Sequence, residues 1–328
     1  MMIKVLKPGF LTTVQDLGRT GYQKDGFIVS GAMDSFSLRV GNILVGNSEK
    51  EAGLEITLQG PVLSVEEDTI IAITGGDLSP TIENEVLPMW RPVYVKKGSV
   101  IEWGSAKSGC RAYLTVAGGV DVPKVMGSKS TYLRAAIGGF EGRQLKKGDI
   151  LLTEKMIDYS LLPVFDKVHR AYSTVSWQAQ YPHHFSQLGT KKVRVLPGMH
   201  YSQFTKKSLD AFFHESFQVN TQSDRMGYRL SGSLLERRQK DEILSEAVTL
   251  GTIQVPADGN PVILLADRQT TGGYPRIGQV AATDISVVAQ TKPGEYLTFE
   301  EISWEEAELL YFEEQRDINA IKHGMYCK

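Results

Sequence analysis

Two polar stretches of this sequence combine charged side chains with glycines, which is the composition of a ligand-binding loop. Residues 266–275 read Ala-Asp-Arg-Gln-Thr-Thr-Gly-Gly-Tyr-Pro and follow an apolar run with the length of a buried strand. Residues 15–19 read Gln-Asp-Leu-Gly-Arg. A loop that leaves a rigid strand can present several side chains to one point, and its glycines let the backbone approach a ligand. The alternative for each stretch is a surface turn whose polar groups satisfy one another.

Three further loops could bind an anion. The segment 30–34, Ser-Gly-Ala-Met-Asp, leads into a predicted helix, whose first amide groups attract negative charge. Its Asp34 is also a natural helix cap. Arg225 could bind an anion or the carboxylate of a neighbouring strand, and Lys129 lies in the polar loop 127–131.

Arg19 illustrates the two interpretations that apply to each cation. It could hold a substrate carboxylate in a bidentate contact, because a guanidinium presents two parallel donors. It could equally pair with Asp16 inside its own turn. The sequence leaves both alternatives open.

Several common catalytic motifs are absent from the sequence. The loop 127–131 reads Gly-Ser-Lys-Ser-Thr, which lacks the glycine and lysine spacing of a nucleotide phosphate loop. The sequence contains no Gly-x-Ser-x-Gly elbow, no His-Glu-x-x-His and no Met-Lys-Met biotin-attachment tripeptide. No metal site is therefore expected, and ATP or biotin chemistry would require a partner.

Composition bounds the class of protein. A chain of 328 residues predicts about two domains. The formal net charge of −2 argues against a nucleic-acid partner, and the apolar runs are too short to span a membrane. Cys110 and Cys327 fit free thiols, and the N-terminus lacks the apolar core of a signal peptide, so a cytoplasmic protein is expected.

The sequence contains one pattern twice. The turn Pro8-Gly9 closes a short strand pattern and returns as Pro197-Gly198, and other landmarks return at separations of 189 to 197 residues. Among them, Thr74-Gly75-Gly76 matches Thr271-Gly272-Gly273. Such regularity indicates two copies of one β-rich unit. The predicted domains are a first barrel unit at 1–155, a connector at 156–190 and a second barrel unit at 191–328.

Short, glycine-bounded apolar runs predict a mostly-β fold of two tandem barrel units with few short helices. The clearest helices are 34–45, capped by Asp34, and the segment that opens with the capping box Ser303 and Glu306. The predicted strands of the first unit are 56–63, 69–74, 92–95, 100–103, 111–116 and 150–153. Those of the second are 193–196, 252–255, 262–266, 287–289 and 296–299.

Taken together, these phrases resemble the allophanate hydrolase subunit 2 family, also called the KipA family or the family of 5-oxoprolinase C subunits. The resemblance covers about residues 3–300 and rests on an ordered set of motifs. These are Gln15-Asp16-Leu17-Gly18-Arg19, Ser30-Gly31-Ala32-Met33-Asp34, Leu44-Val45-Gly46-Asn47, Leu54-Glu55-Ile56-Thr57, Gly127-Ser128-Lys129-Ser130-Thr131 and Asp267-Arg268-Gln269-Thr270-Thr271-Gly272-Gly273-Tyr274-Pro275.

The resemblance implies a pair of cyclophilin-like β-barrels and work beside two partners, a KipI-like B subunit and a LamB/YcsF-like A subunit. Together the three proteins cleave 5-oxo-L-proline to L-glutamate with ATP, which we expect to be bound with or by a partner. One alternative is a regulatory protein that antagonises a KipI-type inhibitor of a sensor histidine kinase. Another is the carboxyltransferase component of a biotin-dependent, urea-type carboxylase.

The substrate chemistry then assigns hypothetical roles. Arg19 or Arg225 would supply a cation for the substrate carboxylate, Gln269 and Thr270 would donate to the developing oxyanion, and Asp34 or Asp267 would act as the base. The remaining candidates for substrate binding are Gln15, Asp16, Ser30, Lys129, Thr271 and Tyr274.

Overall fold

The computed structural model describes residues 2–154, 165–180, 190–239 and 242–326. Contacts between Cα atoms divide the chain into two compact units. The first contains Met1–Arg19, Ser30–Phe185 and Arg316–Lys328, and the second contains Thr20–Val29 and Ser186–Gln315. The first unit is therefore assembled from both ends of the chain.

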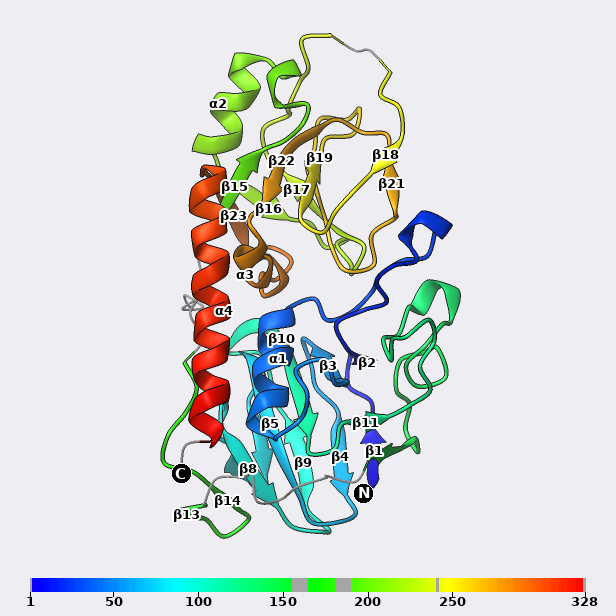
Figure 1. Ribbon diagram of the computed structural model, residues 1–328, viewed down its shortest axis with the longest axis vertical. Helices are drawn as coiled ribbons and strands as arrows, with labels where there is room; N and C mark the ends of the chain where they lie inside the picture. The colour runs from blue at the N-terminus through cyan, green and yellow to red at the C-terminus, as the bar shows by residue number, and fades with distance from the viewer. Residues whose placement is uncertain (1, 155–164, 181–189, 240–241, 327–328) are drawn as a thin grey trace. The chain divides into compact units, whose positions relative to one another are not determined.

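The first unit is built from two seven-stranded sheets (Figure 1). One has the order β11 (Val120–Asp121), β12 (Ile150–Thr153), β1 (Met2–Lys7), β4 (Val62–Val65), β9 (Val100–Trp103), β6 (Pro80–Ile82) and β7 (Glu85–Val86). The other has the order β13 (Lys167–Val168), β14 (Tyr172–Thr174), β8 (Pro92–Val95), β5 (Thr69–Asp77), β10 (Ser108–Val116), β3 (Gly53–Thr57) and β2 (Leu11–Gln15).

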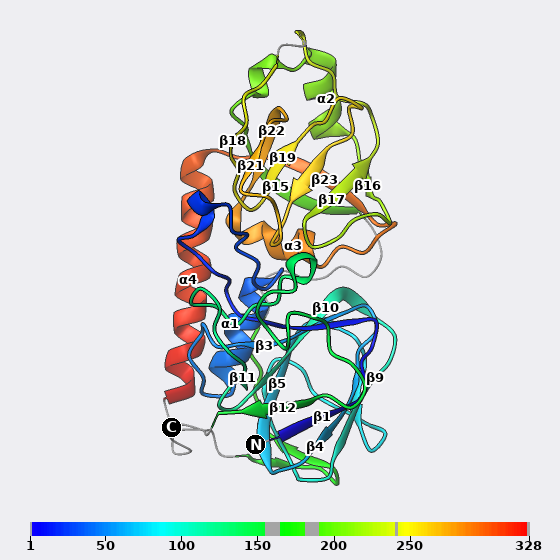
Figure 2. The same ribbon diagram turned by 90° about the vertical axis from the view of Figure 1, so that its right-hand side faces the viewer.

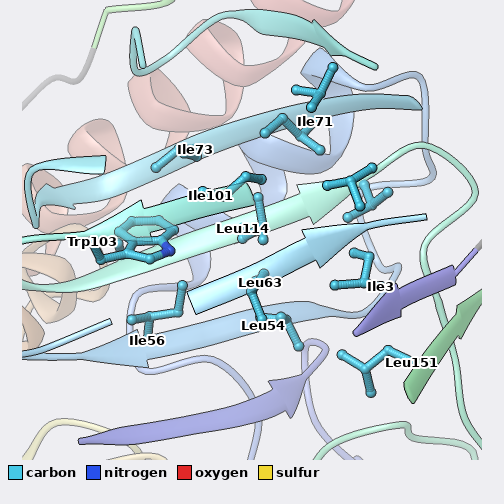
Figure 3. Packing of buried hydrophobic residues seen from close by; sticks show 14 of the residues in the cluster. Ile3, Leu54, Ile56, Leu63, Ile71, Ile73, Ile101, Trp103, Leu114 and Leu151 are labelled. Atoms are coloured by element: carbon cyan, nitrogen blue, oxygen red, sulfur yellow. The ribbon is translucent and has the colours of Figure 1, made fainter. Parts of the chain in front are cut away.

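Both sheets contribute to one hydrophobic core. Ile3 and Leu63 come from the first sheet, whereas Leu54, Ile71 and Leu114 come from the second, and all five are almost fully buried. Figure 3 shows these side chains gathered between the strands. Every strand pair in these sheets for which a register is defined is antiparallel, and the alternation of buried and exposed residues in β1 places one face toward this core.

A second apolar cluster forms under helix α1 (Ser35–Leu44), which lies across β5 and β10 (Figure 1). Its members include Phe36 and Val40, and it also contains Ile318 and Met325 from the end of the chain. The predicted cap is confirmed, because the Asp34 carboxylate accepts a hydrogen bond of 3.0 Å from the Ser37 amide.

The second unit contains a closed barrel, several of whose strands are labelled in Figure 2. The barrel order is β15 (Thr190–Pro197), β22 (Arg276–Val280), β19 (Thr252–Gln254), β20 (Val262–Leu264), β17 (Gly227–Ser231), β16 (Phe217–Val219) and β23 (Tyr296–Glu301). The parallel pair β15–β23 closes it. A separate two-stranded sheet joins β18 (Glu246–Ala247) to β21 (Thr271–Gly272).

The mostly-β fold class is confirmed, with one β-rich unit in each part of the chain. The helices α2 (Lys206–His214) and α3 (Ile285–Ala289) are short, as expected. Helix α4 (Trp304–Tyr326) is longer than predicted, at 23 residues. Its capping box is confirmed by reciprocal bonds between Ser303 and Glu306, of 2.7 and 3.1 Å.

Two predicted strands are wrong. The run 56–63 is two strands rather than one, because Leu58 has a φ of +61° and the chain turns there, so that β3 and β4 join different sheets. Residues 287–289 lie in α3, since a short buried apolar run fits a helix as well as a strand.

One pair of segments that the repeated pattern matched lies in different structural elements. Thr74-Gly75-Gly76 lies inside β5, paired with β10, whereas Thr271-Gly272 forms β21 at the small sheet. These two segments are not equivalent in the fold. Residues 165–180, within the segment interpreted as a connector, carry β13 and β14, which extend a sheet of the first unit.

No helix within the described residues is long and apolar enough to cross a membrane.

Candidate functional site

In the first unit the carboxylate of Asp16 organises a buried cluster of loops. It accepts hydrogen bonds from the Ser128 hydroxyl at 2.7 Å, from the Lys129 amide at 2.6 Å and from the Ser130 hydroxyl. It also accepts from the Gly18 amide at 2.8 Å. Asp16 is 7% exposed, so these donors replace water as the partners of its charge. The polar loops 15–19 and 127–131, separate in the sequence, are therefore one structure.

Arg19 lies in the same cluster and is buried. Its Nη2 donates to the Ser130 carbonyl. Gly138 faces both groups, because a Cβ added there would lie 2.7 Å from Arg19 Nη2 and 2.2 Å from the Ser130 oxygen. Gly138 also has a φ of +67°, so glycine is required here by conformation and by close approach.

The segment 30–34 is fixed to this cluster by three consecutive amides. Ala32 donates to the Asp16 carbonyl, Met33 donates to the Glu55 carboxylate and Asp34 donates to the Tyr113 hydroxyl, each at 2.8 Å. Ser30 precedes these contacts in a left-handed conformation, with a φ of +56° that is uncommon outside glycine. The loop is held in place, and its first residue is strained.

Asp34 acts as the cap of α1. Both of its carboxylate oxygens accept from Ser37, one from the amide and the other from the hydroxyl at 2.7 Å. The side chain is fully buried. These contacts correspond to the structural alternative for Asp34 rather than to a base that faces a ligand.

Glu55 and Tyr113 belong to the site region but were not among the predicted residues. The Tyr113 hydroxyl donates to Glu55 Oε2 at 2.8 Å, and both side chains are buried. Burial raises the pKa of Tyr113 well above its ordinary value, and the negative charge of Glu55 raises it further. The sequence signal that could have identified Glu55 is a carboxylate inside an otherwise apolar pattern, Leu54-Glu55-Ile56.

Lys129 has partners other than a ligand. Its Nζ lies 2.7 Å from Glu51 and 3.0 Å from Glu154. Only 3% of its side chain is exposed. Burial lowers the pKa of the ammonium group, but the hydrogen bonds and charges of the two carboxylates outweigh burial and raise it overall. Lys129 therefore fits a structural role in holding its loop.

In the second unit Arg225 and Asp267 form a buried ion pair. Arg225 Nε donates to Oδ2 at 3.0 Å and Nη2 donates to Oδ1 at 3.2 Å. The Asp267 amide donates to the Arg225 carbonyl at 2.8 Å, which ties the two loops together. Both side chains are 6% exposed. The pairing of Arg225 with a neighbouring carboxylate, one of its two alternatives, is observed.

The next residue, Arg268, was also missed by sequence reasoning. Its Nη1 donates to the Leu265 carbonyl at 3.3 Å, and it forms no ion pair with the residues that the structure describes. Burial lowers the pKa of its guanidinium, and no carboxylate in the described part of the chain opposes that effect. A charged group that is partly withdrawn from water without a counter-charge is suited to an anionic ligand.

The remaining predicted residues of this loop are more accessible. Gln269 and Thr270 are half-buried, and the Thr270 carbonyl accepts from Val248 at 3.1 Å. Thr271 is exposed in β21, and Tyr274 is 51% exposed. Gly273, Tyr274 and Pro275 line a pocket of about 680 Å³ in the second unit, beside Leu234 and Arg237.

The predicted residues thus form two groups. Gln15, Asp16, Arg19, Ser30, Asp34 and Lys129 belong to the first unit, and Arg225, Asp267, Gln269, Thr270, Thr271 and Tyr274 belong to the second. Within the described ranges, no three His, Cys, Asp or Glu side chains are grouped so that they could hold a metal ion.

Comparison with protein families decides what this scaffold is. Residues 25–301 match the family described as carboxyltransferase domain, subdomain A and B. The chain belongs to this carboxyltransferase-domain family. Among its relatives, the 5-oxoprolinase C subunit of Escherichia coli (strain K12) is 40% identical over 307 residues, which cover 93% of each chain. The Haemophilus influenzae protein of the same name is 37% identical over 93% of each chain. The resemblance inferred from the motifs is confirmed.

A solved structure is also similar to this carboxyltransferase-domain protein. The Kluyveromyces lactis urea carboxylase matches 100% of the chain with a TM-score of 0.88 and 33% identity. The matched part is 30% of the urea carboxylase chain. The fold is therefore shared with a segment of a much larger enzyme, while the match to the bacterial relatives is reciprocal in length.

Proposed function

We propose that this chain is the C subunit of an ATP-dependent 5-oxoprolinase, which opens the lactam ring of 5-oxo-L-proline to give L-glutamate. The observation that carries the proposal is the 40% identity to a 5-oxoprolinase C subunit over 93% of both chains. Two further proteins, a KipI-like B subunit and a LamB/YcsF-like A subunit, would complete the enzyme, and the chain alone would be inactive.

The reaction explains why an energy source is needed. The lactam is a resonance-stabilised amide that resists attack by water. Transfer of the terminal phosphoryl group of ATP to the lactam oxygen would provide a better electrophile, with ADP as the leaving group. Addition of one water to the lactam carbonyl carbon and cleavage of its C–N bond, with the ring nitrogen taking a proton, would open the ring to γ-glutamyl phosphate. A second water would then hydrolyse this acyl phosphate to glutamate and phosphate. We assign the nucleotide to a partner subunit.

The donors of the loop 127–131 support that assignment, because they do not fit a nucleotide phosphate. Both serine hydroxyls donate to Asp16, and the ammonium group of Lys129 is paired with Glu51 and Glu154. A phosphate loop requires these groups to point at the ligand. No step of the reaction is therefore routed through this loop.

The remaining roles follow from the contacts. We assign the substrate carboxylate to a guanidinium, Arg19 in the first unit or Arg268 in the second, since Arg225 is paired with Asp267. Gln269 and Thr270 stay the candidate donors to the developing oxyanion. Asp34 and Asp267 each hold a neighbouring group and are assigned as positioning residues.

A second candidate function rests on the structural match to urea carboxylase. The same scaffold could act as the carboxyltransferase component of a biotin-dependent carboxylase that acts on a small amide. The sequence contains no biotin-attachment tripeptide, so the biotin would be carried outside these 328 residues. The chain covers only 30% of the urea carboxylase but 93% of the Escherichia coli 5-oxoprolinase C subunit, so the carboxylase is the weaker candidate.

The test is an omission experiment on the purified proteins. We expect 5-oxoproline-dependent ATP hydrolysis and glutamate release only when this chain is mixed with both partners. Equal turnover without this chain would contradict the proposal. A stable complex with the KipI-like partner and no turnover would favour the regulatory role, and biotin-dependent carboxylation of urea would favour the second candidate.

A further inference from the structure

Several buried polar atoms of the first unit have no hydrogen-bond partner among the described residues, and two of them belong to the neighbouring segments 15–19 and 30–34. One is the hydroxyl oxygen of Ser30, a residue that is 5% exposed, and the other is the carboxamide oxygen of Gln15, which is fully buried. Buried polar groups are normally satisfied, and an exception calls for an explanation such as a ligand.

Gln15 ends strand β2 and Ser30 lies in the segment 30–34, and these two parts of the chain are fastened together. The hydrogen bond from the Ala32 amide to the Asp16 carbonyl joins them one residue after Gln15 and two residues after Ser30. Gly31 also packs against the other loop, because a Cβ added there would lie 2.9 Å from the Gly18 nitrogen. Both groups are therefore parts of one rigid structure.

The chemical character of each atom is fixed by its surroundings. Gln15 Nε2 donates to the Thr131 carbonyl at 3.2 Å and to the Thr13 hydroxyl at 3.0 Å. A carbonyl can only accept, so the amide nitrogen must face Thr131 and the oxygen must face the other way as an acceptor. The Ser30 hydroxyl can donate. The pair thus offers one acceptor and one donor.

The strained backbone of Ser30 gives an independent indication of function. Its φ of +56° is uncommon for a residue other than glycine. Conformations of this kind persist where the surrounding structure enforces them, and they gather at ligand sites. Here the surrounding structure is the row of fixed amides at Ala32, Met33 and Asp34.

We propose that Ser30 and Gln15 recognise the edge of a cis amide. The Ser30 hydroxyl donates to the ligand carbonyl, and Gln15 Oε1 accepts from the ligand N–H. A lactam and urea both present a carbonyl and an N–H on one edge, whereas a trans peptide bond presents them on opposite edges. The choice of 5-oxoproline as the ligand rests on the proposed function, but the recognition of the amide edge does not.

The experiment measures ligand binding by calorimetry with the full chain in complex with its partners. Ser30→Ala should weaken 5-oxo-L-proline binding about tenfold, the effect of one lost hydrogen bond to a buried group. Ser99→Ala, a buried serine of the same unit outside these loops, should change it less than about twofold. The N-methyl analogue of 5-oxoproline, which lacks the N–H, should bind the unaltered protein at least about tenfold more weakly.

Each result decides between the claims. Unchanged binding by Ser30→Ala, in a variant with an unaltered thermal transition, overturns the inference, as does equal binding of the N-methyl analogue. If 5-oxoproline does not bind the unaltered complex, the proposed function fails, and the same variants are titrated with urea. A tenfold loss with urea then retains the amide-edge inference, and the absence of binding by both ligands overturns it.

Discussion

The polar loops of the two units differ in how completely their charges are used. In the second unit Arg225 and Asp267 satisfy each other through two hydrogen bonds. In the first unit the charge of Asp16 is met by four donors from two loops, while Ser30 and Gln15 keep polar atoms without a partner among the described residues. Two charges that satisfy each other stabilise the fold. A cluster that keeps buried polar atoms without a hydrogen-bond partner among the described residues is suited to bind a ligand.

The largest expected effect would come from breaking the ion pair of Arg225 and Asp267. Arg225→Leu or Asp267→Leu should each lower the free energy of unfolding of the second unit by about 3–5 kcal/mol, since one charge is left buried without its partner. Denaturant unfolding monitored by a probe in that unit measures this. The double variant should lose less than the sum of the two single variants. A single variant of normal stability with no turnover would instead return the pair to a catalytic role.

The first unit can be tested through its glycines. Gly138→Ala and Gly148→Ala both place alanine at positive φ, with φ values of +67° and +93°, at a cost of about 1–2 kcal/mol. The added Cβ meets open space at Gly148 but lies 2.2 Å from the Ser130 oxygen at Gly138. We expect Gly138→Ala to cost about 1–3 kcal/mol more and to abolish turnover.

Thermal unfolding and turnover of the reconstituted enzyme measure both effects. Equal behaviour of the two alanine variants would show that the close packing between Gly138 and Arg19 has no functional importance.

Arg268 tests whether the second unit also has an unused charge. Loss of a charge-assisted hydrogen bond to an anionic substrate removes about 1.5–3 kcal/mol. Arg268→Gln should therefore raise KM for 5-oxoproline about tenfold to a hundredfold. Arg229→Gln removes an exposed arginine from the same barrel and serves as the control. If both variants had the KM of the unaltered enzyme, Arg268 would have no role in binding the substrate.

The smallest effects are in the pH dependence of stability, and they have opposite signs in the two units. Burial raises the pKa of Tyr113, so its contribution is complete below about pH 10 and is lost as the pH rises toward the folded value. Burial lowers the pKa of His200, so its contribution is complete above about pH 6.5 and is lost as the pH falls through the folded value.

Tyr113→Phe should remove the alkaline dependence and His200→Gln the acidic one, as measured by unfolding at a series of pH values. If neither substitution changed the pH dependence of unfolding, the ionisation of these two residues would have no effect on the stability of their units.

Sequence reasoning succeeded where the physical cause is local. The Asp34 cap and the box of Ser303 and Glu306 involve residues three positions apart, so their chemistry is legible in the chain. It failed for the run 56–63, because nothing in the apolar pattern reveals that Leu58 has positive φ.

The candidate site was predictable in its loops but not in its partners. The sequence identified Asp16 and Lys129 as polar loop residues, yet their contacts span 112 and 78 positions of chain. Whether Lys129 binds a ligand or Glu51 depends on strand order, which no short-range pattern contains. Arg268 was overlooked because its importance lies in a counter-charge that is missing among the described residues.

The passage of Ile318 and Met325 into the apolar cluster of the first unit has a consequence for biosynthesis. A ribosome delivers the chain from the N-terminus, and a domain made of contiguous residues can fold as soon as it emerges. Here the cluster under α1 cannot be completed until residues 318–325 have left the ribosome. Nascent chains that stop near Gln315 should expose Phe36 and Val40 and require a chaperone, although all the described strands have already been synthesised.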